Sequence, residues 1–310
     1  MLTDSAEVSL PTPPETSPEN SGVTQGIEPG SALPRAVLRI EASSGWSAVN
    51  VREIWQFRDL LLSLAGRDLK LRYKQTALGV IWVVLQPLLA AGVFSFVFGT
   101  VAGLPSDGKP YFLFSYAGLL GWNLFANTLS KCSTCLVGNS QLISKVFFPR
   151  LVLPLSTVPS VLIDFVVALG MMIVLMLIYR IAPTPALLLL PVWMAALLML
   201  ALGIGLCAAS LTVSYRDVQY ILPVVIQILL YASPVAYKLS YALKKLKPAA
   251  RPFYLLNPLC APLEAFRWSF LRGDRPAMWP LGYSIGAAIV TFIVGAYAFK
   301  RMERKFADVI

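Results

Sequence analysis

Residues 181–215 read IAPTPALLLLPVWMAALLMLALGIGLCAASLTVSY and contain no charged side chain. A helix that crosses a membrane needs about 20 predominantly apolar residues, so this stretch is long enough to cross once. Charged side chains are also absent from residues 75–106, 110–130, 218–237 and 276–299. Residues 151–179 carry only Asp164. The sequence therefore predicts an all-α membrane protein with six transmembrane helices, at about residues 77–102, 110–130, 151–179, 186–213, 218–237 and 277–299.

The composition of the 310-residue chain agrees with this prediction. Charged residues make up 14% of the chain, whereas soluble domains contain about 25%. The absence of histidine excludes His-based acid–base catalysis and His metal ligands. Cys132-x-x-Cys135 has the spacing of a zinc or redox pair, but no second pair completes four ligands. We therefore expect no metal and no cofactor in this chain.

Two segments precede the first expected membrane helix. Residues 1–50 are rich in Pro, Ser, Thr and Glu and lack apolar periodicity, which predicts a disordered tail. Residues 51–74 place polar and basic side chains on one helical face and apolar side chains on another. A basic amphipathic helix at this position is expected to lie in the cytoplasmic membrane interface. The alternative is a helix packed on a protein surface.

Basic residues predict the orientation in the membrane, because short cytoplasmic loops carry an excess of Lys and Arg. Basic residues gather in the two terminal flanks and in the loops on the same side of the membrane. They are Arg67, Lys70, Arg72, Lys74, Lys131, Lys145, Arg150, Arg216, Lys300, Arg301, Arg304 and Lys305. The two short loops on the other side carry only Lys109 and Arg180. Both termini are therefore expected in the cytoplasm. The same pattern indicates membrane topology and not a nucleic-acid partner.

One segment opposes this orientation, since residues 238–275 carry eight basic residues on the expected outer side. Within it, residues 253–272 are apolar but interrupted by Asn257-Pro258 and Pro262. Proline ends or kinks a helix. The pattern favours a re-entrant pair of short helices over a seventh transmembrane helix.

Two further motifs bear on mechanism. Residues 103–109, GLPSDGK, match the start of a phosphate-binding loop, but Pro110 replaces the required Ser or Thr and the context is a loop between apolar stretches. We therefore expect no ATP hydrolysis by this chain. Asp164 is an intramembrane acid, which either forms hydrogen bonds in helix packing or takes part in proton coupling.

Aromatic residues are dense in the first two expected membrane helices. They include Trp82, Phe94, Phe98, Tyr111, Phe114, Tyr116, Trp122 and Phe125. Such rings form interfacial belts in membrane proteins, and flat apolar rings also suit stacking on sugars. Both interpretations stay open. Gly99-x-x-x-Gly103 and Gly282-x-x-x-Gly286 have the spacing that permits close helix approach.

Residues 131–150 form an expected cytoplasmic turn that is too polar to cross a membrane. Its second half offers aromatic and basic candidates for docking a soluble partner, namely Lys145, Phe147, Phe148, Pro149 and Arg150. The alternative is a loop whose basic residues only hold the topology.

Four ordered segments resemble the permease subunits of type-2 ATP-binding-cassette exporters of polysaccharides. They are RDLKLRYKQTALGVIWVVLQPLL (67–89), NSQLISKVFFPRLVLPL (139–155), SYRDVQYILPVVIQILLYASPVAY (214–237) and LLNPLCAPLEAFRWSFL (255–271). The resemblance covers residues 52–305, within which residues 75–305 would form the six-helix permease domain.

The resemblance implies a homodimeric permease of the bacterial inner membrane, paired with two ATPase subunits that bind ATP and magnesium. Such proteins move lipid-linked glycans, such as O antigen, from the cytoplasmic leaflet to the outer side. They are in contact with the membrane lipids. It also implies that residues 51–72 form an interface helix and residues 139–150 a coupling helix. The re-entrant segment, with Asn257, Pro258, Glu264 and Arg267, would close the outer side.

Three other functions remain open from the sequence. They are an exporter of small molecules or drugs with the same architecture, a proton-coupled secondary transporter that uses Asp164, and a membrane-embedded transferase. The transferase would need clustered carboxylates or a histidine near the interface, which the chain lacks.

Overall fold

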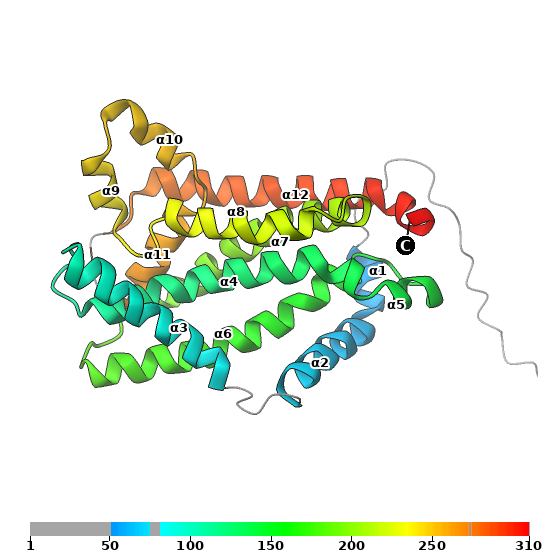
Figure 1. Ribbon diagram of the computed structural model, residues 1–310, viewed down its shortest axis with the longest axis horizontal. Coiled ribbons are helices and arrows are strands. Elements are labelled where there is room, and N and C mark those ends of the chain that lie inside the picture. The colour runs from blue at the N-terminus through cyan, green and yellow to red at the C-terminus, as the bar shows by residue number, and fades with distance from the viewer. Residues whose placement is uncertain (1–50, 75–80, 272, 274, 310) are drawn as a thin grey trace, which may run out of the picture. The chain divides into compact units, whose positions relative to one another are not determined.

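The computed structural model describes residues 51–74, 81–271, 273 and 275–309, and every regular element in these ranges is helical (Figure 1). The predicted all-α class is therefore confirmed. The expected tail at residues 1–50 lies outside the described residues, as do residues 75–80 at the predicted start of the first membrane helix.

The segment expected to form one amphipathic helix consists of two, α1 (Val51–Gln56) and α2 (Arg58–Lys74), joined at Phe57. Leu64 and Ala65 of α2 are buried, and α2 packs against α6. Trp55 and Leu62 are exposed. The segment thus packs one apolar face against the bundle and leaves other apolar side chains exposed.

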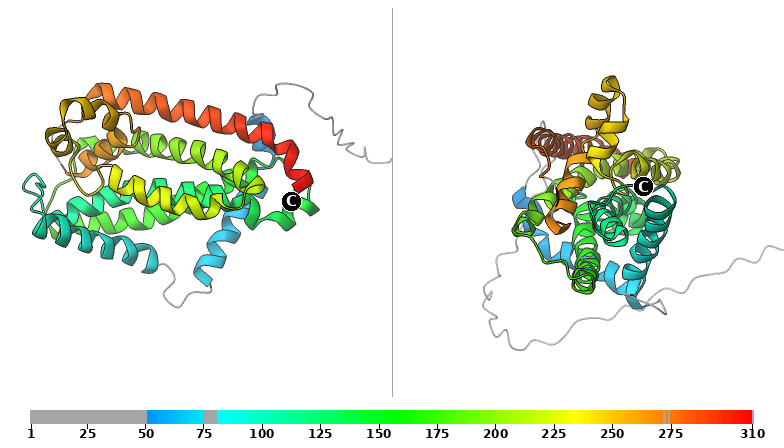
Figure 2. Two further views of the ribbon diagram at one scale, coloured as in Figure 1. Left: turned by 45° about the horizontal axis from the view of Figure 1, so that its top comes forward. Right: turned by 90° about the vertical axis from the view of Figure 1, so that its left-hand side faces the viewer.

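Six helical segments form the bundle, and Figure 2 shows their axes running roughly side by side. Their bounds are α3 (Ile81–Phe94) continued by the π-helix η1 (Ser95–Val101), α4 (Tyr111–Gly138), α6 (Val152–Ile178), the 3-10 helix η2 (Pro185–Leu189) leading into α7 (Leu190–Ser214), α8 (Val218–Ala232) and α12 (Met278–Val309).

Short helices lie at the two ends of the bundle. One end carries α9 (Leu239–Lys245), η3 (Pro248–Ala250), α10 (Arg251–Leu255) and α11 (Cys260–Leu271), and we call it the α11 end. The other carries α5 (Ser140–Lys145) and the last turns of α12, and we call it the α5 end (Figure 1).

Four helical segments among the described residues are long and apolar enough to cross a membrane: Ile81–Val101, Val152–Ile178, Pro185–Ser214 and Met278–Glu303. The helix α8 is apolar but has only 15 residues, a length of about 22 Å at 1.5 Å per residue. The helix α4 has 28 residues and is long enough, but it is less apolar because it carries Asn123, Asn127 and Lys131.

The core is centred on α4 and α7. Helix α4 packs against α3, α6, α7 and α11, and α7 packs most extensively against α12 and α4. Large buried side chains such as Tyr116, Phe125 and Phe266 fill the space between them. The Tyr116 hydroxyl donates to the Ala168 carbonyl at 2.9 Å, which satisfies a polar group inside this core.

The crossing of α7 and α12 depends on glycines that the sequence motifs did not single out. A Cβ added at Gly203 would lie 2.7 Å from the backbone nitrogen of Phe292, and one at Gly295 would meet the backbone of Gly203. The backbones of the two helices therefore touch directly. Gly282 and Gly286, which have the predicted spacing, meet nothing within 4 Å.

Replacing Gly203 with Ala should force α7 and α12 apart, because the new Cβ would overlap backbone atoms that cannot rotate away. Overpacking of this kind costs about 1–3 kcal/mol. We expect a lower midpoint of thermal unfolding in detergent. It is measured as the loss of the monodisperse peak in size-exclusion chromatography after heating.

The matched control for this variant is Gly170→Ala on α6, where an added Cβ meets nothing within 4 Å. Alanine favours helix over glycine by about 1 kcal/mol, so this midpoint should stay equal or rise. Equal midpoints for the two variants would contradict the proposed backbone contact.

Candidate functional site

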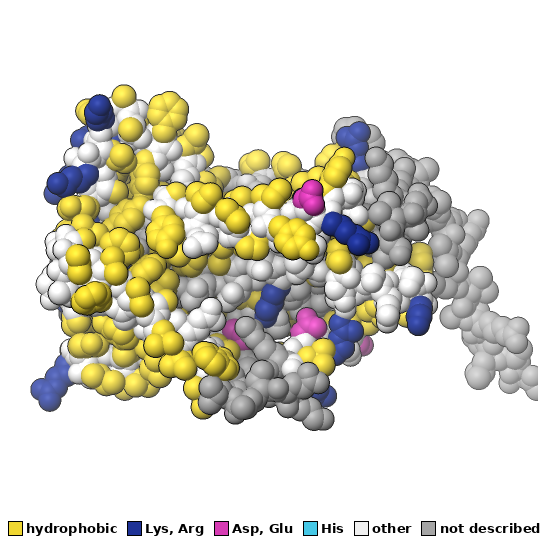
Figure 3. Space-filling view, viewed as in Figure 1, with side chains coloured by type: hydrophobic (Ala, Val, Ile, Leu, Met, Phe, Trp, Pro, Cys, Tyr) yellow, Lys and Arg dark blue, Asp and Glu magenta, His cyan; other side chains and the backbone are white. Residues whose placement is uncertain are grey.

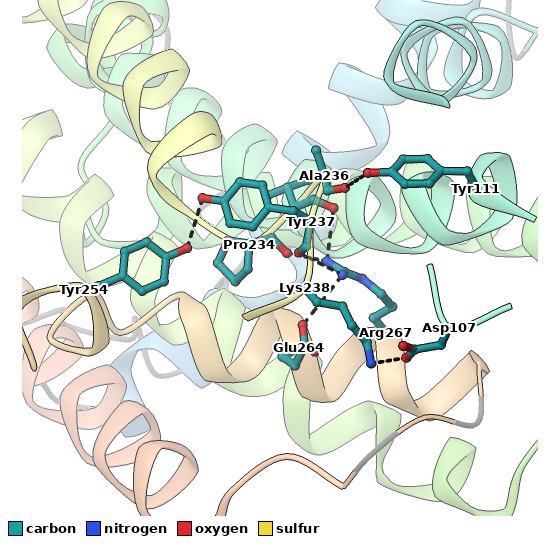
Figure 4. A network of polar contacts seen from close by, with 10 residues as sticks. Asp107, Tyr111, Pro234, Ala236, Tyr237, Lys238, Tyr254, Glu264 and Arg267 are labelled. Atoms are coloured by element: carbon teal, nitrogen blue, oxygen red, sulfur yellow. Dashed lines mark hydrogen bonds and ion pairs between the residues drawn. The ribbon is translucent and has the colours of Figure 1, made fainter. Parts of the chain in front are cut away.

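At the α11 end, a buried arginine binds the irregular turn between α8 and α9, residues 233–238. The Arg267 side chain is only 4% exposed. Its guanidinium donates to the carbonyls of Tyr237 at 3.1 Å and Val235 at 3.1 Å, and also to that of Pro234 (Figure 4). Because the fixed fork of guanidinium donors suits several acceptors at once, one side chain satisfies a run of backbone carbonyls that helix formation leaves unpaired.

The charge of Arg267 is balanced on two sides. The guanidinium carbon lies 4.1 Å from the centre of the Phe114 ring, within the range of a cation–π interaction. Glu264, one turn earlier on α11, lies 3.7 Å from it. Glu264 and Arg267, two of the four residues expected to close the outer side, are thus brought together, and Arg267 holds α11 against α4.

Other polar contacts attach the neighbouring segments to the same turn. Asp107, in the loop between η1 and α4, forms an ion pair with Lys238, and Tyr111 donates to the Ala236 carbonyl at 2.6 Å (Figure 4). The phenols of Tyr237 and Tyr254 lie 3.0 Å apart. Burial raises the pKa of Tyr254 above its ordinary value, so this phenol keeps its proton.

Asn257 lies in the break between α10 and α11, where the sequence predicted a break. Its amide donates to the Ser233 hydroxyl at 3.0 Å, and its side-chain oxygen accepts from the backbone nitrogen of Leu259 at 3.0 Å. Pro258 follows in the same turn, and Tyr283 of α12 donates to the Leu256 carbonyl just before it. All four residues expected to close the outer side therefore lie within or beside one network of contacts.

At the α5 end, the structure separates the two phenylalanines that the sequence treated as a pair. Phe147 is 73% exposed, whereas Phe148 is 6% exposed and packs in the cluster formed by α2, α4, α6, α7 and α12. Lys145 is exposed at the end of α5, and Pro149 and Arg150 are half-buried. The surface that a partner can reach therefore includes Lys145, Val146 and Phe147.

Two contacts hold this turn in place. Arg150 donates its side chain to the Glu303 carbonyl at 2.6 Å and its backbone nitrogen to the Glu303 carboxylate at 3.2 Å. Arg67 of α2 donates to the side-chain oxygen of Asn139, the residue before α5. Residues 139–150, the segment that the resemblance predicts to be a coupling segment, are thus bonded to both α12 and α2.

The candidate sugar-stacking aromatics fall into two groups. Phe114, Tyr116, Trp122 and Phe125 are buried in the bundle core, where they contact other side chains of the same chain. Trp82 is exposed, while Phe94, Phe98 and Tyr111 are half-buried. Within the described chain, Trp82 is thus the member of the set with an open ring face, and stacking on a sugar stays a prediction.

Asp164 has a partner that the sequence analysis did not assign. Lys131 lies 3.4 Å from its carboxylate and 3.0 Å from the Ser160 hydroxyl. The sequence placed Lys131 in a cytoplasmic turn because the expected membrane helix ended at residue 130, whereas α4 continues to Gly138. The four-residue steps from Asn123 to Asn127 to Lys131 could have indicated that one helical face carries them all.

Comparison with known proteins places this arrangement in a family. The sequence profile of the ABC-2 type transporter family matches residues 59–271, and the chain belongs to this family. The O-antigen export system permease protein RfbA of Myxococcus xanthus is 32% identical over 261 residues, which is 84% of this chain and 98% of that protein.

Two further relatives come from enterobacteria. The O-antigen export system permease protein RfbA of Klebsiella pneumoniae is 26% identical over 81% of this chain and 95% of its own length. The polysialic acid transport protein KpsM of Escherichia coli is 25% identical over 76% of this chain and 91% of its own length.

Replacing Asp164 with Leu should destabilise the protein, because Lys131 then keeps a partly buried charge without its carboxylate. Breaking one side of a fully buried ion pair costs about 3–5 kcal/mol, whereas an exposed pair contributes about 0–1 kcal/mol. Because Lys131 is 28% exposed, we expect a loss between these limits. Replacing both partners by apolar side chains is often neutral. The double variant Asp164→Leu with Lys131→Met should therefore recover most of the lost thermal stability in detergent. A double variant as unstable as the single one would show that the pair does not balance these charges.

Proposed function

We propose that this chain is the permease subunit of an ATP-driven exporter that moves a lipid-linked polysaccharide from the cytoplasmic to the outer side of the bacterial cell membrane. The observation that carries the proposal is the similarity to the Myxococcus O-antigen permease, which extends over nearly the whole of that protein. The KpsM relative is named for transport of another polysaccharide, which supports the same class of cargo.

In this proposal the chain crosses the membrane six times, through α3 with η1, α4, α6, α7, α8 and α12. Helix α4 can cross although it carries polar residues, because neighbouring helices surround it. Helix α8 is shorter than the hydrocarbon layer of about 30 Å, and the turn at residues 233–238 completes its crossing. Six crossings place both termini on the cytoplasmic side, as the basic residues indicate.

ATP would be bound and hydrolysed by a separate subunit, as is implied by membership of the ABC-2 family. The exposed part of the predicted coupling segment, residues 139–150, lies around Phe147 and is the surface we assign to that subunit. An exposed aromatic ring beside a basic residue is typical of an interface anchor. Motion of the ATPase would then reach α12 through the Arg150–Glu303 contacts.

A passage for a chain of sugars would lie between two copies of this chain. The space between α4, α6, α7 and α11 is filled by large buried side chains, and protein cores of this kind contain few voids larger than a water molecule. A homodimer with two ATPase subunits is therefore the assembly we propose, with α10 and α11 at its outer side.

Deletion of the gene should leave lipid-linked polysaccharide inside the cell and remove it from the cell surface. The measurement is surface labelling of the polysaccharide in intact cells compared with its total amount in lysates. Purification of the full chain in mild detergent should also recover a soluble ATPase in about equal amount. Unchanged surface polysaccharide together with no associated ATPase would overturn the proposal.

The Phe147→Ala variant should lose the associated ATPase while it keeps its thermal stability, because that ring is exposed. Phe148→Ala is the contrasting variant at the next position. It removes a buried ring, which costs about 3–5 kcal/mol, so its thermal stability and protein level should fall. The docking role of Phe147 fails if its variant retains the ATPase at wild-type ratio.

A further inference from the structure

Two cavities lie along the contact between α4 and α6, and polar side chains form part of the wall of each. The larger, of about 460 Å³, opens between α2, α4 and α6 at the α5 end, with Arg67, Lys131, Thr134 and Thr157 in its wall. The smaller, of about 70 Å³, lies further along the same helices beside α3. Its polar wall consists of Gln86, Asn123, Asn127 and Asp164.

Lys131 joins the two cavities. It lines the larger one, and its ammonium group binds Asp164, which lines the smaller one, and Ser160 between them. Polar atoms therefore continue from the α5 end toward the middle of the bundle. We call this line of side chains the polar furrow, and it consists of Gln86, Asn123, Asn127, Lys131, Ser160 and Asp164.

The furrow follows from helical periodicity on two facing helices. Asn123, Asn127 and Lys131 recur every four residues on α4, so they share one face. Ser160 and Asp164 have the same spacing on α6, opposite that face. In Figure 3 the viewed face carries basic and acidic side chains close together in its middle, between areas of hydrophobic side chains.

The three amides of the furrow have no hydrogen-bonding partner within the described part of the chain. An amide transferred to an apolar environment without a hydrogen bond costs about 2–7 kcal/mol. Three such groups are therefore too costly to face lipid tails at the depth of transmembrane helices. They require water or a polar ligand.

We propose that the polar furrow is a water-filled binding surface for the hydroxyl groups of the exported saccharide. The inference rests on the proposed function and names a contact site for its cargo. An amide both donates and accepts hydrogen bonds, as does a sugar hydroxyl. A space of about 70 Å³ holds several water molecules, so the furrow contacts the edge of a sugar chain and does not enclose it.

Cysteine accessibility tests this surface in the intact complex. The variant Asn127→Cys is made in the full chain and expressed in cells that lack the native copy. Membrane vesicles are then treated with a charged, water-soluble methanethiosulfonate reagent. Because only a hydrated thiol ionises and reacts, Asn127→Cys should label at least about tenfold faster than a lipid-facing position. Asn123→Cys should behave in the same way.

The matched control is Val166→Cys on α6, because Val166 is 62% exposed but lies outside both cavities. The parent chain, with its four native cysteines, gives the background rate. Recovery of each variant in the membrane fraction, with a thermal unfolding midpoint in detergent equal to that of the parent chain, shows that the chain is inserted and folded. Labelling of Asn127→Cys as slow as that of Val166→Cys overturns the proposal.

The cargo is tested by repeating the labelling in two strains, one that makes its surface polysaccharide and one blocked in its synthesis. Slower labelling of Asn127→Cys in the producing strain supports a saccharide in the furrow. Fast labelling that is equal in both strains overturns saccharide binding there. The proposed function is judged separately, by retention of polysaccharide inside cells that lack the chain.

Discussion

The hydrocarbon layer of a membrane offers no hydrogen bonds, so each polar group at that depth needs a partner inside the protein or a wet surface. Helix α4 meets this constraint at several of its polar side chains, although the buried Ser115 hydroxyl has no partner within the described residues. Thr128 donates to the Leu124 carbonyl of its own helix, and Lys131 binds Asp164 on α6. Helix α6 contributes buried polar side chains as well, including Ser160 and Asp164.

The same constraint explains the α11 end. The chain leaves helical geometry at residues 233–238, and the freed carbonyls of that turn would be costly without donors. Arg267 and Tyr111 supply donors from two different helices, while Asn257 binds Ser233 at the start of the turn. An irregular segment is thus stable beside a membrane bundle because side chains replace the hydrogen bonds that a helix would have made.

The sequence predicted the features that depend on local composition. It did not predict the features that depend on how the helices pack. Long uncharged stretches predicted the helices, and Asn257-Pro258 predicted the break between α10 and α11. Periodicity could not separate exposed Phe147 from buried Phe148, because adjacent residues differ only in what the fold places against them. The sequence also did not predict the Lys131–Asp164 pair, because the charge of Lys131 predicted a helix end at residue 130, whereas α4 continues to Gly138.

The direct backbone contact between α7 and α12 also indicates where this bundle can deform. With no side chain between Gly203 and Gly295 to change rotamer, these two helices behave as one stiff unit, and separating them would expose backbone along with apolar surface. Helix α8 differs, because none of its residues is buried and it packs on α4 and α7 over a small area. The energetic cost of displacement is therefore lowest at α8, which can shift against the rigid unit of α7 and α12 more easily than those two helices can shift against each other.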